Sequence, residues 1–316
     1  MPQRQGAAEL RPTSTSAVLP RDPVAKSWHI EVCLNELVEY ERSAGFDAFE
    51  FDNQALPELA LADIELGVDL GGKRLQAPLM IAPMTGGTEQ GFAINRVLAS
   101  AAQRFGLAMG VGSQRLALER ADAAAWFQVR DIAPDILLFA NLGAGQLARG
   151  WGSTQARQAV EMIGANALFV HFNAVQKAIQ GGDLDFRGLA VRLRDLCRDL
   201  AFCARTARRR ALGMRFGEWG IPTARSILNV RAASSGITLI ASGGLRSGID
   251  LAKANALGAD VGAMARPMLV RAMQGAAALH EFIEDVLTEL RICMFAAGAG
   301  SVAALRGRAH PVGADV

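Results

Sequence analysis

The sequence predicts an α/β fold, a TIM (βα)8-type barrel that is incomplete or distorted, with about six recognisable barrel strands. Three observations predict it. Short apolar runs recur at a spacing of about 30 residues, as in repeated strand–helix units. Helical patterns separate them, and most runs end in Gly or a small polar residue. Consecutive apolar positions, as in Leu79 to Ala82, are typical of strands buried on both faces of a parallel sheet.

The elements follow in order. Apolar residues at helical spacing from His29, with a stop at Gly45, predict an N-terminal helix. Alternating residues around Gly71-Gly72 predict a hairpin over residues 64–75, which could plug the bottom of the barrel. The predicted barrel strands are 78–84, 107–112, 135–141, 167–173, 237–241 and 259–266.

Composition bounds the function. The 316 residues are 51% hydrophobic and 20% charged, which is too apolar for disorder and sufficient for a large core. The net charge of +2 argues against a dedicated nucleic-acid or membrane-surface protein and favours small-molecule partners. We expect a flexible tail over residues 1–22 and a single domain over residues 23–316.

Cysteine usage and hydropathy bear on the compartment. The four cysteines have no CxxC spacing, so neither a disulfide framework nor a zinc site is indicated. No apolar stretch approaches the roughly 18 to 20 residues of a membrane span, and the N-terminus lacks the apolar core of a signal peptide. We expect a cytoplasmic protein with reduced thiols.

Polar residues gather where the predicted strands end. In a barrel of this class the functional site lies on the loops at the carboxyl ends of the strands. A lone His or Asn in such a place is often structural, but the shared position favours a site. These residues are Thr85, Ser113, Asn141, His171, Ser242 and Arg266.

A glycine-rich turn predicts a phosphate site. Ser242-Gly243-Gly244 leads into a helix near Gly248, whose first N–H groups and positive dipole end can hold a phosphate. Ala265-Arg266 after the next strand would complete the corner between the last two strands. The alternative is an ordinary strand-to-helix turn.

The blocks PLMIAPMTGG, MGVGSQR, ANLGA, HFNAVQKAIQ, WGIPTA, ASGGLRSGIDLAKANALGAD and ARP occur in the order seen in one family. From about Lys26 to about residue 305 the chain resembles the type 2, FMN-dependent isopentenyl-diphosphate isomerases. The resemblance implies an isomerase of isoprenoid biosynthesis that interconverts isopentenyl and dimethylallyl diphosphate on a TIM barrel. It also implies reduced FMN as an acid–base cofactor, NADPH as flavin reductant and Mg2+ on the diphosphate. We further expect a homo-oligomer without nucleic-acid or membrane partners.

The resemblance assigns roles by position. Gln176 and His171 would be catalytic, with Gln176 facing the reacting carbons. The diphosphate substrate would be held by Lys26, His29, Arg115, Asn173 and Gln176. FMN would be held by Thr85, Gly86, Ser113, Asn141, Gly243, Gly244, Arg246, Ala265 and Arg266.

The chain also departs from the family. Ala25 stands where the family has an Arg, and Lys177 stands at the position of the carboxylate that binds Mg2+, so we expect no metal site there. Between Phe186 and Trp219 roughly 40 residues, a strand, a helix and a strand, are missing, which would leave a barrel with open edges.

Three functions stay open at this point. One is an active isomerase, in which Lys177 could contact the diphosphate in place of Mg2+. The second is a catalytically impaired or inactive relative that binds flavin or a partner chain. The third is a nucleic-acid or anionic-partner role for Arg205 and Arg208 to Arg210, although a charge run on a helix is usually a solvated face.

Overall fold

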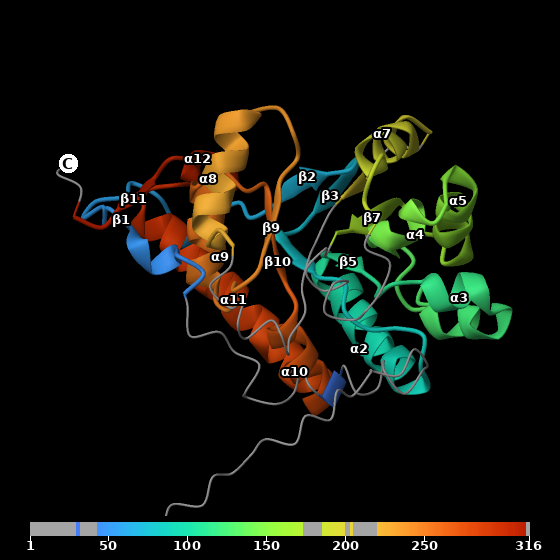
Figure 1. The fold of residues 1–316 in the computed structure, drawn as a ribbon. Coiled ribbons are helices and arrows are strands. Elements are labelled where there is room, and N and C mark those ends of the chain that lie inside the picture. The colour runs from blue at the N-terminus through green and yellow to red at the C-terminus, as the bar shows by residue number, and fades with distance from the viewer. Residues whose placement is uncertain (1–29, 32–42, 173–184, 200–202, 205–219, 314–316) are drawn as a thin grey trace, which may run out of the picture.

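The structure is a computed structural model that describes residues 30–31, 43–172, 185–199, 203–204 and 220–313. The predicted tail and most of the predicted N-terminal helix lie outside these ranges. Figure 1 shows an α/β arrangement in which a curled sheet is flanked by helices, with the short β1–β11 ribbon at the periphery.

The central sheet has seven parallel strands within the described ranges, in the order β8-β7-β6-β5-β4-β10-β9. Sequential strands are neighbours from β4 to β8, and the crossover joins β4 to β10, as expected when a barrel sheet curls back toward its beginning. The strands are β4 Leu79–Ile81, β5 Ala108–Gly110, β6 Leu138–Gly143, β7 Ala167–His171, β8 Cys203–Ala204, β9 Ile240–Ser242 and β10 Val261–Met264.

Six of these strands fall on the predicted runs, and β8 is an addition. The prediction placed no strand between 173 and 237, because it found no β-branched apolar run there, and the apolar residues 200–204 that end in Cys203–Ala204 include none of Val, Ile or Thr. Its two residues pair with Leu168 and Phe169 of β7. The strand predicted at 237–241 is also displaced, since the ladder begins only at Ile240.

The sheet does not close within the described ranges. β8 and β9 are its two end strands, and no pairing joins them there. The result is a curled half-barrel, which confirms the predicted incomplete barrel.

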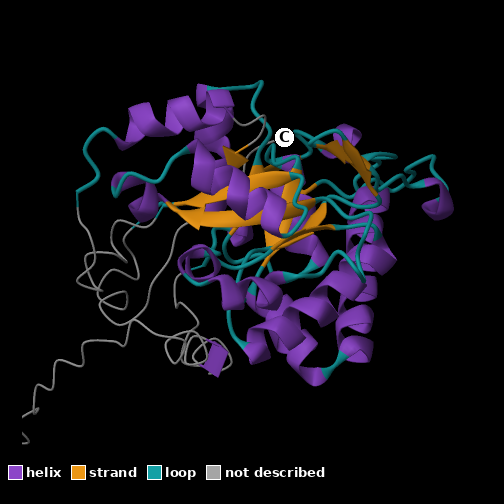
Figure 2. Ribbon diagram, turned by 90° about the vertical axis from the view of Figure 1, so that its right-hand side faces the viewer, coloured by secondary structure: helices purple, strands orange, loops and turns teal. Residues whose placement is uncertain are grey.

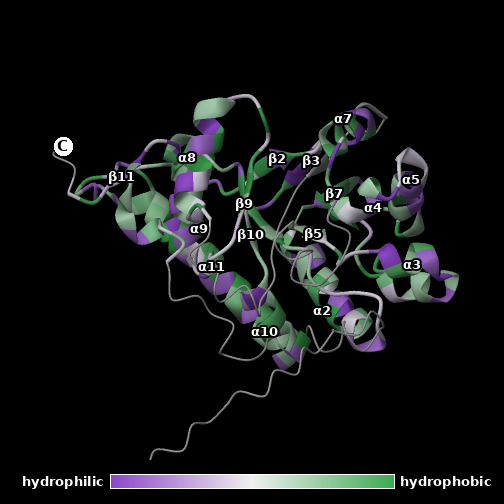
Figure 3. Ribbon diagram, in the orientation of Figure 1, coloured by the Kyte–Doolittle hydropathy of each residue, from purple (hydrophilic) through white to green (hydrophobic). Residues whose placement is uncertain are grey.

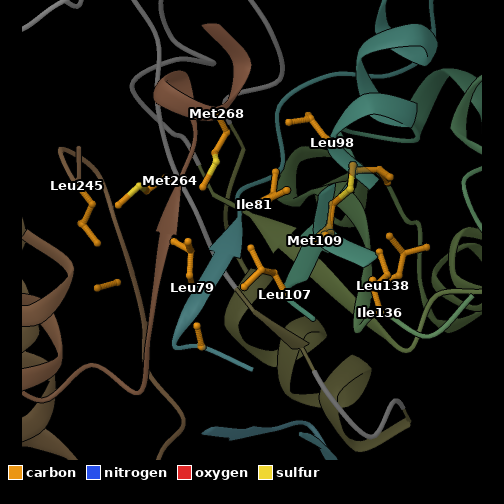
Figure 4. Close-up of a cluster of buried hydrophobic side chains, with 14 of the residues drawn as sticks. Leu79, Ile81, Leu98, Leu107, Met109, Ile136, Leu138, Leu245, Met264 and Met268 are labelled. Carbon is orange, nitrogen blue, oxygen red and sulfur yellow. The ribbon is translucent and has the colours of Figure 1, made fainter. Parts of the chain in front are cut away.

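Two apolar clusters follow from the alternation of side chains along the strands. One lies between the sheet and its helices, and Figure 4 shows its members Leu79, Ile81, Met109, Leu138 and Met264. The alternate positions of the same strands form the second cluster on the inner face. It contains Met80, Ala108, Phe139, Phe169 and Ala263, among others.

The predicted hairpin is present and packs on the inner face. β2 Val68–Leu70 and β3 Lys73–Leu75 pair antiparallel around Gly71 and Gly72, both of which have positive φ. Leu70 and Leu75 belong to the inner cluster. Lys73 donates to the carbonyls of Asp135 and Ile136, just before β6, so the hairpin lies at the amino-terminal ends of the strands. The expected plug is thereby confirmed.

Helices surround the sheet (Figure 2). α2 packs on β4 and β5, α5 on β6 and β7, and α11 on α9, α10 and α2. The strands of the central sheet are mostly apolar, with polar exceptions such as Asn141 and His171, whereas helices such as α5 carry several polar residues (Figure 3). The helices are α2 Glu89–Phe105, α3 Arg115–Glu119, α4 Ala144–Ala148, α5 Ser153–Met162, α7 Leu189–Asp199, α8 Thr223–Ala233, α9 Gly248–Ala256, α10 Arg266–Gln274, α11 Ala276–Ala296 and α12 Val302–Leu305.

The remaining elements are short. The 3-10 turns Phe46–Ala48, Leu61–Asp63 and Ala121–Phe127 lie in the connections. β1 Phe49–Phe51 pairs antiparallel with β11 Ala309–Pro311, which ties the two ends of the described chain together. Among the described helices, none combines the length and the apolarity that crossing a membrane requires.

Candidate functional site

The described candidate residues share one edge of the sheet, as predicted. Asn141 lies within β6, and His171 is the last residue of β7. Thr85 and Ser113 follow β4 and β5 by a few residues, and Ala265 and Arg266 follow β10 directly. Parallel strands end at a common edge, so these groups converge at the carboxyl-terminal mouth of the half-barrel.

Thr85 is fixed by bonds to the protein. Its hydroxyl donates to Asn95 Oδ1 on α2 at 2.6 Å, and Asn95 Nδ2 donates back to the Thr85 carbonyl at 3.1 Å. The same carbonyl accepts the Gly112 N–H at 2.7 Å. A Cβ on Gly112 would lie 2.5 Å from that oxygen, so the loops after β4 and β5 can approach only because residue 112 is glycine. The backbone after β4 is therefore held rigidly.

Position 86, which follows Thr85, also accepts only glycine. Its φ is +144°, and a Cβ there would lie 2.4 Å from Phe127 Cε1. This close approach is to the protein itself, so the structural reason for Gly86 is packing against Phe127.

Asn141 and His171 form the polar centre of the inner face. They follow the inward register of Phe139 and Phe169 along β6 and β7. Asn141 is buried, and its Oδ1 lies 2.9 Å from His171 Nδ1. Gly143 keeps the room for this ring, since a Cβ there would lie 3.0 Å from His171 Nε2.

Gln114 supports this pair. Its side chain is fully buried. Its backbone N–H donates to the Asn141 carbonyl, and its Oε1 accepts the Asn141 N–H. It lies within the MGVGSQR block, but the sequence interpretation gave it no role. The same holds for Asn95. Nothing in one sequence marks either amide as a partner of a residue 10 to 27 positions away.

The predicted phosphate corner lies between β9 and β10. Ser242 Oγ donates to the Ala263 carbonyl at 3.1 Å, and the following Gly243 and Gly244 are exposed with φ of +108° and +80°. A Cβ on Gly244 would lie 2.4 Å from Ala44 Cβ, so this turn passes close to the N-terminal segment. The structure thus presents an exposed, glycine-lined turn here.

At the start of α9, three backbone N–H groups donate to protein acceptors. Gly248 N–H donates to Glu289 Oε2 at 2.6 Å, Asp250 N–H to Ser247 Oγ, and Arg246 N–H to Asp250 Oδ2. A carboxylate already occupies the positive end of the dipole.

Arg115 begins α3, and its guanidinium pairs with Glu119 one turn later at 2.7 Å. Both side chains are partly exposed. Glu119 thus holds this cation near the mouth.

Five candidates lie outside the described residues, namely Lys26, His29, Asn173, Gln176 and the replaced metal position Lys177. Within the described ranges no three His, Cys, Asp or Glu side chains are grouped so that they could hold a metal ion.

Comparison with known proteins decides the family. A curated protein of Synechococcus sp. named isopentenyl-diphosphate delta-isomerase is 43% identical, covering 90% of this chain and 94% of its own length. The proteins of the same name from Nostoc sp. and Stutzerimonas stutzeri are 38% and 41% identical, each covering 89% of this chain and 93% and 94% of their own lengths. This chain belongs to the isopentenyl-diphosphate delta-isomerase family. A profile of FMN-dependent dehydrogenases matches residues 215–310, which identifies the FMN-dependent, type 2 branch.

Solved structures agree on the fold. A mandelate oxidase is similar with a TM-score of 0.61 at 19% identity, covering 86% of this chain and 88% of its own. A flavocytochrome b2 is similar with a TM-score of 0.65 at 16% identity, covering 89% and 82%.

The family match also bears on the missing segment. The alignment with the Synechococcus protein extends over 329 positions, more than the 316 residues of the whole chain, although only 90% of the chain takes part. Several tens of aligned positions are therefore filled in the relative alone. This agrees with the strand–helix–strand missing from the sequence and with the open half-barrel.

Proposed function

We propose that this chain is an FMN-dependent isomerase that interconverts isopentenyl diphosphate and dimethylallyl diphosphate in isoprenoid biosynthesis. The observation that carries the proposal is the 43% identity over 90% of the chain to a protein named for that activity. The convergence of the candidate polar residues at one sheet edge supports it. The impaired-relative alternative has no comparable support.

The corner after β9 and β10 fits the phosphate of FMN. An exposed turn of Gly243 and Gly244 with positive φ presents backbone N–H groups, and Arg246, Ala265 and Arg266 adjoin it. Backbone donors beside guanidinium groups are the chemistry that phosphate requires. The flavin ring would then lie toward Thr85, Gly86, Ser113 and Asn141. Bound in reduced form, FMN would supply acid–base chemistry and an electron-rich surface.

The chain's own residues would hold the substrate and exclude water. Adding a proton to an unactivated alkene gives carbocation character, which needs a dry, preorganised pocket. The apolar inner face below Asn141 and His171 suits that need. We assign the diphosphate to Lys26, His29, Arg115, His171 and Asn173, and Gln176 to the reacting carbons.

NADPH is the proposed reductant of the flavin. We further infer that Lys177 contacts the diphosphate directly, in place of the Mg2+ that the family uses, because an ammonium group at that position repels a cation. A cytoplasmic homo-oligomer is the proposed state.

The test begins with an FMN titration of the full chain, followed by flavin fluorescence and an isomerase assay with NADPH. Replacing Arg266 with Met should raise the FMN Kd about tenfold, as expected for losing a charge-assisted contact. Arg271→Met is the matched control on the same helix, because Arg271 is exposed and bonds Gln274. Equal affinity of the two variants would contradict the assigned corner.

Turnover separates the remaining outcomes. FMN binding with isomerisation supports the proposal, and FMN binding without it favours the impaired relative. Turnover that survives chelation supports direct contact by Lys177, whereas strict dependence on Mg2+ contradicts that contact.

A further inference from the structure

The regular hydrogen-bond ladder between β5 and β6 ends beside the candidate site, next to Asn141. Met109 N–H donates to the Leu137 carbonyl and Val111 N–H to the Phe139 carbonyl, so the next partner of the ladder would be Asn141. At that point the chain after β5 turns away toward α3. Asn141 would lose its strand neighbour there, at a buried position where unpaired backbone groups are costly.

Gln114 replaces the missing neighbour. Its N–H donates to the Asn141 carbonyl at 2.9 Å, and its Oε1 accepts the Asn141 N–H at 3.0 Å. Its Nε2 donates to the Ala159 carbonyl on α5 at 2.8 Å, which fixes the orientation of the amide. One fully buried side chain thus joins the turn after β5, strand β6 and helix α5.

The two bonds from Gln114 to the Asn141 backbone also fix how the Asn141 side chain is oriented. With its N–H taken by Gln114, its side-chain Nδ2 donates to the Val111 carbonyl at 3.0 Å. Its Oδ1 is then the atom that lies 2.9 Å from His171 Nδ1. Because an amide oxygen only accepts, the imidazole must carry its proton on Nδ1 in this contact.

We propose that Gln114 is a positioning residue that, through Asn141, sets the tautomer of His171. The inference rests on the proposed function for its consequence, because that function places His171 on the substrate. A neutral ring with its proton on Nδ1 has Nε2 as its acceptor. His171 would therefore face the substrate side in one defined tautomer.

The test reads the ring itself. In the full chain labelled with 15N, the imidazole nitrogens of the four histidines are recorded by NMR, and His171→Gln assigns the signals of interest. Wild type should show His171 with Nδ1 protonated. Gln114→Leu should lower the ratio of that tautomer to the other by about tenfold, as for the loss of one well-formed hydrogen bond.

Gln128→Leu is the matched control, since Gln128 Nε2 also donates to a carbonyl of α5, that of Met162, but Gln128 makes no bond to Asn141. An unchanged His171 tautomer in folded Gln114→Leu, or an equal change in Gln128→Leu, would overturn the proposal. If Gln114→Leu does not fold, Gln114→Glu decides. Its carboxyl group can mimic the amide only when protonated, so the tautomer ratio should change with pH as that group ionises.

Turnover is a separate measurement. If wild type shows the expected tautomer but no isomerisation, the positioning role stands and the proposed function fails. If wild type turns over substrate and Gln114→Leu leaves the tautomer unchanged, the positioning role fails alone.

Discussion

Two guanidinium groups hold the amino-terminal ends of strands in two regions of the sheet, Arg130 at β6 and β7 and Arg231 at β9 and β10. Arg130 Nε donates to the Gly164 carbonyl at 2.8 Å, and its Nη2 donates to Asn166 Oδ1 at 2.7 Å. The same Oδ1 accepts the Leu138 N–H at 3.0 Å. One amide oxygen therefore joins the arginine to the first residue of β6.

The second region repeats this pattern atom for atom. Arg231 Nε donates to the Gly258 carbonyl at 2.5 Å, and its Nη2 donates to Asp260 Oδ2 at 2.6 Å. That oxygen also accepts the Leu239 N–H at 2.7 Å. In each region the two acceptor residues belong to one tripeptide, Gly-Ala-Asn at 164–166 and Gly-Ala-Asp at 258–260. The same pattern of hydrogen bonds thus occurs twice, before β7 and before β10.

The regions differ in charge and in support. Asp260 is an acid where Asn166 is a neutral amide, and Asp260 takes a second guanidinium, that of Arg306, at 2.7 Å. Burial raises the pKa of Asp260, but the Leu239 N–H and the two guanidinium groups outweigh it, so the pKa lies below its ordinary value. β6 and β7 each have strands on both sides, whereas β9 pairs only with β10 in the described ranges. The charged acceptor, Asp260, therefore stands beside β9, the strand with a neighbour on one side only in the described ranges.

The largest expected effect comes from removing the two arginines in turn. Arg231→Met should lower the free energy of unfolding by about 3 kcal/mol, because it removes one of the two guanidinium groups that bond Asp260 and leaves several turn carbonyls without their donor. Arg130→Met should cost a similar amount, since that group also gathers the carbonyls of Ala133, Pro134 and Ile136. Urea denaturation measures both.

The location of the damage separates the two variants. Amide hydrogen exchange should speed up mainly at β9 in Arg231→Met, while in Arg130→Met it should stay confined to the ends of β6 and β7. Because β9 leads into the proposed phosphate corner, FMN affinity should fall more in Arg231→Met. Equal losses of affinity would mean that the edge position of β9 does not matter.

A medium effect is expected from the glycines of the two tripeptides. Gly258 has φ of +117°, and a Cβ there would lie 2.7 Å from Arg231 Cγ. Gly164 has φ of +58°, in the left-handed helical region, and its Cβ would lie 3.4 Å from Arg130 Cγ. Gly258→Ala should therefore cost about 2 to 3 kcal/mol and Gly164→Ala about 1 kcal/mol. Thermal unfolding that ranks them in the opposite order would show that the two hydrogen-bond patterns are not equivalent in geometry.

The sequence predicted the part of the fold that depends on local pattern. Apolar runs located six strands, and Gly71-Gly72 located the hairpin, because both signals lie within a few residues. Strand β8 was missed, since the short apolar run that ends in it contains no β-branched residue, and its pairing with β7 is visible only in the fold. Partners distant in sequence were equally out of reach. Arg130 and Asn166 are 36 residues apart, and Arg231 and Asp260 are 29 apart.

The site divides in the same way. Motifs placed Asn141, His171 and the Gly243-Gly244 turn at one sheet edge. They could not show that Gln114 continues the β5 ladder, because that role exists only where β5 turns away from β6. Nor could they show that Glu289, 41 residues from Gly248, takes the first N–H of α9. Polar side chains that bond backbone across long separations leave no periodic trace.

The smallest effect should appear when the two acceptors are made alike. Asp260→Asn gives the second region the neutral chemistry of the first, and should cost about 1 to 2 kcal/mol at pH 7. The folded-state pKa of Asp260 lies below its unfolded value, so its ionised form stabilises the fold above about pH 4, and this stabilisation is lost as the pH falls through the folded-state pKa. The stability difference between wild type and Asp260→Asn should therefore shrink in acid.

The reverse change, Asn166→Asp, completes the comparison. It places a carboxylate beside Arg130 without a counterpart of Arg306, so any gain should stay below about 1 kcal/mol at neutral pH and vanish in acid. Urea denaturation from pH 7 down to about pH 3 measures both variants against wild type. A pH dependence that persists unchanged in Asp260→Asn would assign the acid sensitivity to other carboxylates. A charge before β10 would then serve the edge strand β9 through its geometry alone, as the neutral amide serves β6.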